Sequence, residues 1–216
     1  MKEIVLIGAS GFVGSAILNE ALDRGHKVTA VVRHPEKITA VHKNLVVKQD
    51  DVSFSGIVPE VSKGADAVIS AYNPGWKNPD IAEETARVYR TILEGVRQSG
   101  VKRFLVVGGA GSLFISSGKR LMDAGVMPEF ILPAVRALAD FYLHDLMAEK
   151  SIDWVFFSPA SMLEPGLRTA KFRLGKDDLI VNEGGESKIS VQDYAVAMID
   201  ELEKPAHHRE RFTIGY

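Results

Sequence analysis

The sequence has no cysteine among its 216 residues. This absence excludes disulfide bridges, thiolate metal sites and thiol nucleophiles, and it is typical of an intracellular protein that needs no covalent cross-links. The chain also lacks an excess of either charge, because its formal net charge is −2. We therefore expect neither nucleic acid nor an anionic membrane surface as a partner.

Long apolar runs, repeats and low-complexity tracts are missing as well. The opening apolar run, Ile4–Ile7, is too short for the core of a signal peptide, and Gly8 follows it directly. No stretch approaches the ~20 apolar residues that a membrane span requires. We expect a cytoplasmic protein with one domain over residues 1–216, present as a monomer or homodimer.

Short apolar runs alternate with longer segments of helical periodicity. The runs contain many Val, Ile and Phe residues with little polar alternation, as in parallel strands covered on both faces. They are Ile4–Ile7, Val28–Val32, Leu45–Val47, Ala67–Ala71, Phe104–Val107 and Trp154–Phe157, and Phe212–Ile214 is a late candidate. Helices are expected up to Gly25 and over about Pro79–Gln98, Pro133–Lys150 and Val191–Glu203. The pattern predicts an α/β protein with a doubly wound parallel sheet, the Rossmann fold, in three layers.

Two stretches, about 110–132 and 160–188, fit this alternation poorly. They follow the fifth and sixth strands and are predicted to be loops, the first with a short helix near Lys119–Asp123. On the helix over about Pro133–Lys150, which separates the two loops, Met147 is predicted to face inward. In an open α/β sheet, ligands bind beyond the carboxyl ends of the strands. We therefore assign both stretches to the substrate side.

A glycine-rich turn joins the first strand to the first helix and reads Gly8-Ala9-Ser10-Gly11-Phe12-Val13-Gly14. In such a turn the first glycine permits a tight exit from the strand, and the second lets the backbone approach a pyrophosphate. The third lets the helix pack closely on the strand. Free N–H groups at the helix N-terminus attract phosphate, and Ser10 can donate a hydroxyl or cap the helix. Because a strand precedes the turn and an amphipathic helix follows it, the turn predicts dinucleotide binding, with a purely structural glycine turn as the alternative.

The end of the second strand indicates which dinucleotide is bound. An NAD site usually has a carboxylate there, whereas an NADP site has an arginine near the 2′-phosphate. This chain has Arg33 at that position, with Lys37 adding positive charge. NADP(H) is favoured and NAD(H) remains possible, with an ordinary surface arginine as the alternative reading.

With these residues the chain resembles the atypical short-chain dehydrogenase/reductases. The resemblance is to the small NAD(P)H-binding group that includes biliverdin-IXβ (flavin) reductase. It runs nearly end to end and rests on Gly8–Gly14, Arg33, Gln49–Val52, Val68–Ala71, Phe104–Ser112, Trp154–Pro159 and Ile189–Ala195.

The resemblance implies roles for several residues of the cofactor site. Asp51 and Val52 would hold the adenine, although a turn-capping carboxylate is an equal reading of Asp51. Ala71 and Tyr72 would line the ribose and pyrophosphate. Residues after the fifth and sixth strands would approach the nicotinamide, namely Gly108, Gly109, Ser158 and Pro159.

The family's catalytic residues do not carry over. Typical members have a serine after the fifth strand and a Tyr-x-x-x-Lys pair that moves a proton. Here Gly108 and Gly109 stand at the serine positions, and Tyr142 is followed four residues later by Leu146. Ser112 is the nearest hydroxyl, as a contact to acceptor or carboxamide or as a turn cap. Tyr142 is the other candidate, with core packing as its alternative.

A reductase that passes hydride to a flavin, quinone or similar planar acceptor tolerates this loss, because solvent can supply the proton. Trp76, in a Pro/Gly loop, could stack on such an acceptor or anchor the loop. The alternatives are a dinucleotide-binding sensor without turnover and a nucleotide-sugar epimerase or dehydratase. The last is disfavoured because only about 55 residues follow Pro159. No metal site is expected, since His207 and His208 lack a third ligand nearby.

Overall fold

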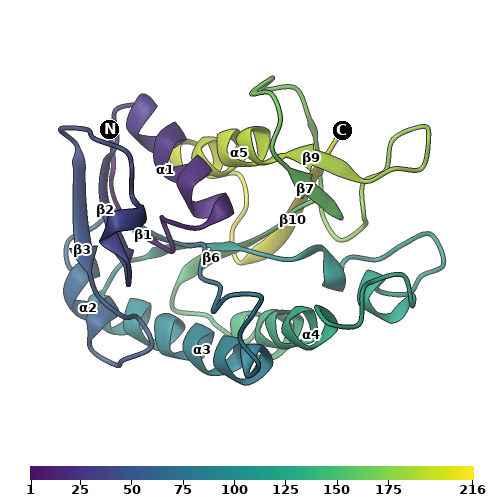
Figure 1. The fold of residues 1–216 in the computed structure, drawn as a ribbon, viewed down its shortest axis with the longest axis horizontal. Helices are drawn as coiled ribbons and strands as arrows, with labels where there is room; N and C mark the ends of the chain where they lie inside the picture. The colour runs from purple at the N-terminus through teal and green to yellow at the C-terminus, as the bar shows by residue number, and fades with distance from the viewer.

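The computed structural model describes residues 1–216 and is built on an eight-stranded sheet (Figure 1). The strand order is β3-β2-β1-β4-β5-β6-β10-β8, and only β8 runs antiparallel to its neighbour. The strands are β1 (Glu3–Ile7), β2 (Lys27–Val32), β3 (Leu45–Gln49), β4 (Ala67–Ser70), β5 (Arg103–Val107), β6 (Asp153–Ser158), β8 (Arg173–Gly175) and β10 (Glu210–Gly215). The predicted doubly wound parallel sheet is confirmed.

The central strands are buried on both faces, whereas β3 is not. In β1, for example, all four residues of Ile4–Ile7 are buried. Strand β3 lies at the edge of the sheet, where Val46 is 55% exposed and Val47 is also exposed. The prediction that all these strands are covered was wrong for β3, because an apolar run does not show whether its strand is central or lies at an edge.

Helices cover both faces of the sheet (Figure 1). Helices α1 (Phe12–Asp23) and α5 (Val191–Glu203) lie on one face, and α2 (Ile57–Ser62), α3 (Ile81–Ser99) and α4 (Leu132–Asp140) lie on the other. Local signals set their ends: α3 stops at Gly100, whose φ is +80°, and the Ser190 hydroxyl caps α5 by accepting from the Asp193 N–H. None of the helices combines the length and apolar character that a membrane crossing requires.

The helix predicted over Pro133–Lys150 changes from an α-helix to a π-helix partway along its length. Helix α4 ends at Asp140 and continues as a π-helical segment, η4 (Phe141–Leu146). A π-helical turn contains more residues than an α-helical turn, so it changes which side chains face the core. Met147 is therefore 47% exposed, although the α-helical spacing predicts that it faces inward. Three short 3₁₀ turns, η1 (Pro35–Lys37), η2 (Ala110–Ser112) and η3 (Leu121–Asp123), complete the helical elements.

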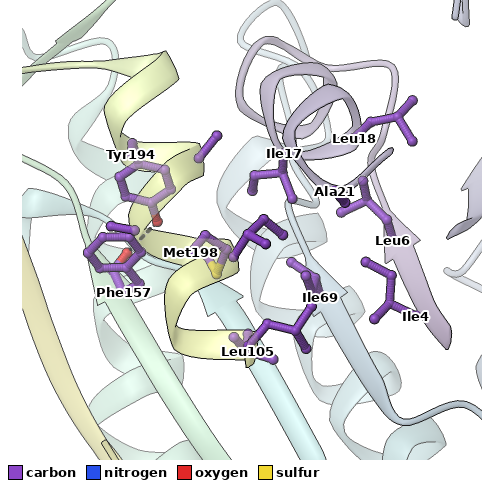
Figure 2. Packing of buried hydrophobic residues seen from close by; sticks show 14 of the residues in the cluster. Ile4, Leu6, Ile17, Leu18, Ala21, Ile69, Leu105, Phe157, Tyr194 and Met198 are labelled. Atoms are coloured by element: carbon purple, nitrogen blue, oxygen red, sulfur yellow. Dashed lines mark hydrogen bonds between the residues drawn. The ribbon is translucent and has the colours of Figure 1, made fainter. Parts of the chain in front are cut away.

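The core consists of two apolar layers, one on each face of the sheet. Figure 2 shows part of the layer beneath α1 and α5, where Ile17, Leu18 and Ala21 of α1 meet Ile4 and Leu6 of β1. In the same layer the buried Tyr194 hydroxyl donates to the Phe157 carbonyl at 2.6 Å. Both helices are therefore held firmly against the strands whose loops form the site.

The stretch over residues 160–188 contains strands that the sequence did not predict. Strand β7 (Met162–Glu164) pairs in parallel with β9 (Lys188–Ser190), and β8 extends the main sheet beside β10. Each of these strands has three residues, which is too short for a recognisable alternation of apolar and polar side chains. The short helix expected near Lys119–Asp123 is the single turn η3.

Candidate functional site

The candidate site lies where the strand order reverses, between β1 and β4. The loop after β1 and the loop after β4 meet there at close range. A Cβ placed on Gly8 would lie 2.4 Å from the Ala71 carbonyl oxygen. In doubly wound sheets, ligands bind in the crevice at this switch point.

The three glycines of the loop are required for different reasons. Gly8 has a φ of +79°, a left-handed conformation that favours glycine. Gly14 has an ordinary conformation, but a Cβ there would lie 2.0 Å from the Gly8 carbonyl oxygen, so only glycine lets α1 sit this close to the loop. Gly11, with a φ of −81°, is the N-terminal cap of α1 and has no side chain to block the approach of a ligand.

The first turn of α1 has free backbone donors. The N–H groups of Phe12, Val13 and Gly14 have no acceptor within the protein, and no side chain caps the helix. Unpaired amides and the positive end of the helix dipole form a site for an anion such as a diphosphate. The loop geometry therefore fits the diphosphate of a dinucleotide.

A cavity of about 610 Å³ extends from this loop along the ends of β4, β5 and β6. Its walls are the glycine loop, the loop Ala71–Trp76, the segment Val107–Ser112, one side of α4 and the segment after β6. Most of the lining side chains are apolar, and none carries a formal charge or is a histidine. The volume lies within the range of pockets that bind small organic ligands.

The ionisable side chains in this cavity are two tyrosines, and both hydroxyls are already bonded. The Tyr72 hydroxyl donates to a carboxylate oxygen of Glu84 at 2.9 Å, and the Tyr89 hydroxyl donates to the Tyr72 carbonyl at 2.9 Å. Burial raises the pKa of both phenols above their usual range, and Glu84 raises that of Tyr72 further. Both phenols therefore stay protonated at neutral pH.

A second cavity, of about 230 Å³, adjoins the first and shares Gly11, Ala71, Tyr72 and Asn73 with it. Its lining also includes residues predicted for the phosphate loop, the 2′-phosphate and the adenine, namely Gly8, Ser10, Arg33, Lys37, Asp51 and Val52. Arg33 and Lys37 are exposed and form no ion pair, whereas an Asp51 oxygen already accepts from the Ser53 N–H at 2.9 Å. The mouth of this cavity therefore has two cations free for an anionic ligand.

The remaining predicted residues divide between the cavity and the core. Gly108, Gly109, Ser112, Trp76 and Pro159 line the larger cavity, in which Trp76 is 57% exposed. The Ser158 side chain is fully buried behind that wall, and its hydroxyl has no partner.

Tyr142 lies outside both cavities. Its ring stacks on Phe156 with a centroid distance of 4.6 Å, and burial raises its pKa. Phe156 lines the larger cavity, so Tyr142 lies one layer behind the wall. This placement favours core packing, the alternative interpretation of Tyr142.

The sequence did not predict that one side of α4 forms a wall of the cavity. Ile131, Val135 and Leu138 recur at helical spacing and line the cavity. The spacing was the available signal, but it identifies an apolar face without showing what that face contacts. Met127, which belongs to the stretch assigned to the substrate side, also lines the cavity, and so does Tyr89, which no sequence feature marks.

An open parallel sheet, a glycine turn at its switch point and an uncapped helix N-terminus define a Rossmann-type nucleotide-binding protein. The family model for NAD(P)H-binding proteins matches residues 8–205, and the chain belongs to that family. Its fold is the one that NAD(P)-binding oxidoreductases of the short-chain dehydrogenase type share.

Three known proteins are similar over nearly the whole chain. YwnB of Bacillus subtilis, an uncharacterised protein, is 42% identical over 98% of this chain and 97% of its own length. The crystal structure of a candidate epimerase from Bacteroides thetaiotaomicron is 66% identical with a TM-score of 0.94, covering 100% of this chain and 97% of that one. A candidate NADH-flavin reductase from Streptococcus pneumoniae is 35% identical with a TM-score of 0.86, covering 100% and 99%.

Proposed function

We propose that the protein is an NAD(P)H-dependent reductase that transfers hydride to a flavin, a quinone or a similar planar acceptor. One observation carries the proposal: the cavity next to the glycine loop is apolar and has no side chain able to exchange a proton near neutral pH. Reduction of a carbonyl to an alcohol usually needs such a group. Reduction of an electron-poor ring needs mainly orientation, because water can protonate the product.

In this proposal the bound NAD(P)H supplies the hydride and leaves as NAD(P)⁺. The free amides of Phe12, Val13 and Gly14 hold its diphosphate, and Asp51 and Val52 contact the adenine. Ala71 and Tyr72, which line both cavities, lie along the ribose and diphosphate. Gly108, Gly109 and Pro159 line the larger cavity and would lie beside the nicotinamide, with no charged or hydrogen-bonding side chain among them.

The acceptor would occupy the rest of the larger cavity. Ile131, Val135 and Leu138 offer it an apolar wall, and the exposed ring of Trp76 can stack on it from the opposite loop. Apolar walls exclude water and hold a flat ring beside the nicotinamide, and closeness and orientation supply a large part of the rate acceleration. The similarity to the Streptococcus pneumoniae protein, a candidate NADH-flavin reductase, supports a flavin as one acceptor.

We further propose that NADP(H) is preferred to NAD(H). Arg33 follows β2, and no carboxylate stands at the tip of that strand. Arg33 and Lys37 line the smaller cavity, and neither forms an ion pair. A 2′-phosphate would form charge-assisted hydrogen bonds there.

The Arg33→Glu variant tests the preference. We expect its dissociation constant for NADP⁺ to rise by about a hundredfold, the loss of one charge-assisted contact plus repulsion, with little change for NAD⁺. Lys43→Glu is the matched control, since Lys43 is an exposed, unpaired cation at the opposite end of the strands. Equal losses for both nucleotides would overturn the assignment of Arg33.

The reaction itself is tested by an acceptor screen. Purified protein is mixed with NADPH or NADH and with riboflavin, 1,4-naphthoquinone or 2,6-dichlorophenolindophenol, and the absorbance at the reduced nicotinamide band is followed. We expect acceptor-dependent oxidation of NADPH. Tight nucleotide binding without any acceptor-dependent oxidation would instead support a sensor that binds the dinucleotide without turnover.

Epimerisation is the activity named for the Bacteroides thetaiotaomicron relative. An epimerase of this fold oxidises and re-reduces its substrate, so it needs a group that takes and returns a proton. The two phenols of the cavity are bonded elsewhere and have raised pKa values, which disfavours this activity. An exchange of solvent deuterium into a nucleotide sugar without net NAD(P)H consumption would reverse this judgement.

A further inference from the structure

Ser112 differs from the other hydroxyls of the cavity in the direction of its hydrogen bond. An Arg211 N–H donates to the Ser112 hydroxyl oxygen at 2.9 Å and to the Ser112 carbonyl at 3.0 Å. A guanidinium can only donate, so the hydroxyl oxygen is the acceptor in this bond. The hydroxyl hydrogen is left without a protein acceptor, and Ser112 lies in the wall of the cavity.

The other hydroxyls do not share this arrangement. Tyr72, Tyr89 and Ser161 give their hydrogens to acceptors within the protein. Thr85 has no hydrogen-bond partner, so nothing determines whether it donates or accepts. Ser112 is therefore the hydroxyl of the cavity that accepts from a cation while its own hydrogen has no acceptor in the protein.

Arg211 itself is held rigidly, 99 residues from Ser112 in the sequence. It lies on β10 with its side chain buried, donates twice to a carboxylate oxygen of Asp177, and covers the ring of Tyr142 at 4.9 Å. Arg120 also donates to the Ser112 carbonyl, at 3.0 Å. These contacts fix the η2 turn and with it the position of the Ser112 oxygen.

We propose that Arg211 is a positioning residue that makes Ser112 an obligate hydrogen-bond donor to the acceptor. The site thereby selects uncharged planar acceptors that carry a carbonyl oxygen or an imine-type ring nitrogen. This inference rests on the proposed function and names the acceptor class of that site. A charged acceptor would find no counter-ion in the cavity, whereas a neutral lone pair finds the Ser112 hydrogen.

The same bond favours the reaction. When the acceptor receives the hydride and its electron pair, its oxygen or nitrogen gains negative charge before water delivers the proton. A donor held beside this atom would stabilise the charge as it forms. An unconstrained serine would turn between donating and accepting, and Arg211 removes that freedom.

Binding gives a test that does not depend on turnover. The probes are 1,4-naphthoquinone and naphthalene, which share a shape and differ in the two carbonyls, and affinities are measured by calorimetry with saturating NADP⁺. The chain has no cysteine, so no thiol adds to the quinone. We expect Ser112→Ala to weaken quinone binding about fivefold, the effect of one hydrogen bond, and to leave naphthalene binding unchanged.

Variants of Arg211 test the positioning role. Arg211→Met is expected to weaken quinone binding by up to about fivefold, as Ser112→Ala does. The double variant is expected to bind the quinone no more weakly than Ser112→Ala alone. Arg211→Lys keeps a donor to the serine oxygen and is expected to retain the preference for quinone. Asp177 is 54% exposed, so removing Arg211 does not leave a buried bare charge.

Turnover then separates this inference from the proposed function. With NADPH, Ser112→Ala is expected to lower kcat for the quinone about tenfold while leaving the affinity for NADP⁺ unchanged. An unchanged quinone-to-naphthalene ratio in Ser112→Ala, or additive losses in the double variant, would overturn the inference alone. A wild-type protein that reduces none of the acceptors would overturn the proposed function, and the acceptor class with it.

Discussion

Replacement of Gly14 by alanine tests the geometry on which the whole site depends. Helix propensity alone predicts a gain, because alanine is about 1 kcal/mol better than glycine inside a helix. The packing predicts the opposite. A Cβ at position 14 would lie 2.0 Å from the carbonyl oxygen of Gly8, 2.7 Å from its carbonyl carbon and 3.0 Å from the Ala9 Cα, and all three atoms belong to the backbone.

The size of the effect follows from these two opposing contributions. A backbone cannot turn aside as a flexible side chain can, so we take the upper part of the usual overpacking cost, about 3 kcal/mol. Subtracting the helix gain of about 1 kcal/mol leaves a net loss of about 2 kcal/mol. For a chain of this size that loss lowers Tm by about 4–8 °C.

The assay is thermal and urea denaturation of Gly14→Ala beside Gly11→Ala. Gly11 has an ordinary φ and its Cβ would have one contact, at 3.3 Å, so we expect its stability to change by less than about 1 kcal/mol. We expect both variants to bind NADP⁺ more weakly, Gly14→Ala because α1 shifts away and Gly11→Ala because a methyl group projects toward the diphosphate. A Tm of Gly14→Ala at or above that of the wild type would refute the close contact between α1 and the loop.

Two further predictions concern Glu149 and Trp76. Burial alone raises the pKa of the Glu149 carboxyl, but hydrogen bonds from Ser151 and Arg97 outweigh it and lower the pKa to about 2. The carboxylate therefore stabilises the fold by about 2 kcal/mol above pH 4.5, after allowance for solvent screening, and this contribution is lost as the pH falls from 4.5 toward 2. Thermal melts from pH 7 to pH 3 should show a flatter decline for Glu149→Gln, and parallel curves would contradict the assignment. For Trp76→Leu we expect about fivefold weaker binding of 1,4-naphthoquinone by calorimetry with an unchanged Tm, because the ring is exposed and is proposed to stack on the acceptor. A lower Tm with unchanged binding would identify Trp76 as a loop anchor.

The parts of the fold that follow from local sequence could be predicted. The apolar runs gave the central parallel strands, and Gly25 and Gly100 marked the ends of α1 and α3 at positive φ. The spacing of Gly8, Gly11 and Gly14 located the turn at the switch point of the sheet, because the positive φ of Gly8 and the contact of Gly14 with the Gly8 carbonyl arise within the seven residues of the turn. Such features are readable because their causes lie close together in the chain.

The parts of the site that depend on distant residues could not be predicted in the same way. Arg211 reaches Ser112 across 99 residues, and no local pattern links them. Val135 and Leu138 have the spacing of a buried helix face, but a helix that packs on a sheet and one that faces a cavity have the same periodicity. Tyr142 was a candidate by residue type, and only its position behind Phe156 separates packing from catalysis.

The composition of the cavity also bears on how selective the protein can be. Its walls are backbone and apolar side chains, with Arg33 and Lys37 free at the nucleotide end and Ser112 at the other. An apolar pocket separates similar ligands only by tens- to about a hundredfold, because a missing or extra methylene changes the binding free energy by only about 1–3 kcal/mol. A hydrogen bond from a fixed donor discriminates further, but it reads a single lone pair and not the rest of the ring. The nucleotide end, with two cations and a row of amides, can therefore be specific, while the acceptor end is expected to accept a class of neutral rings.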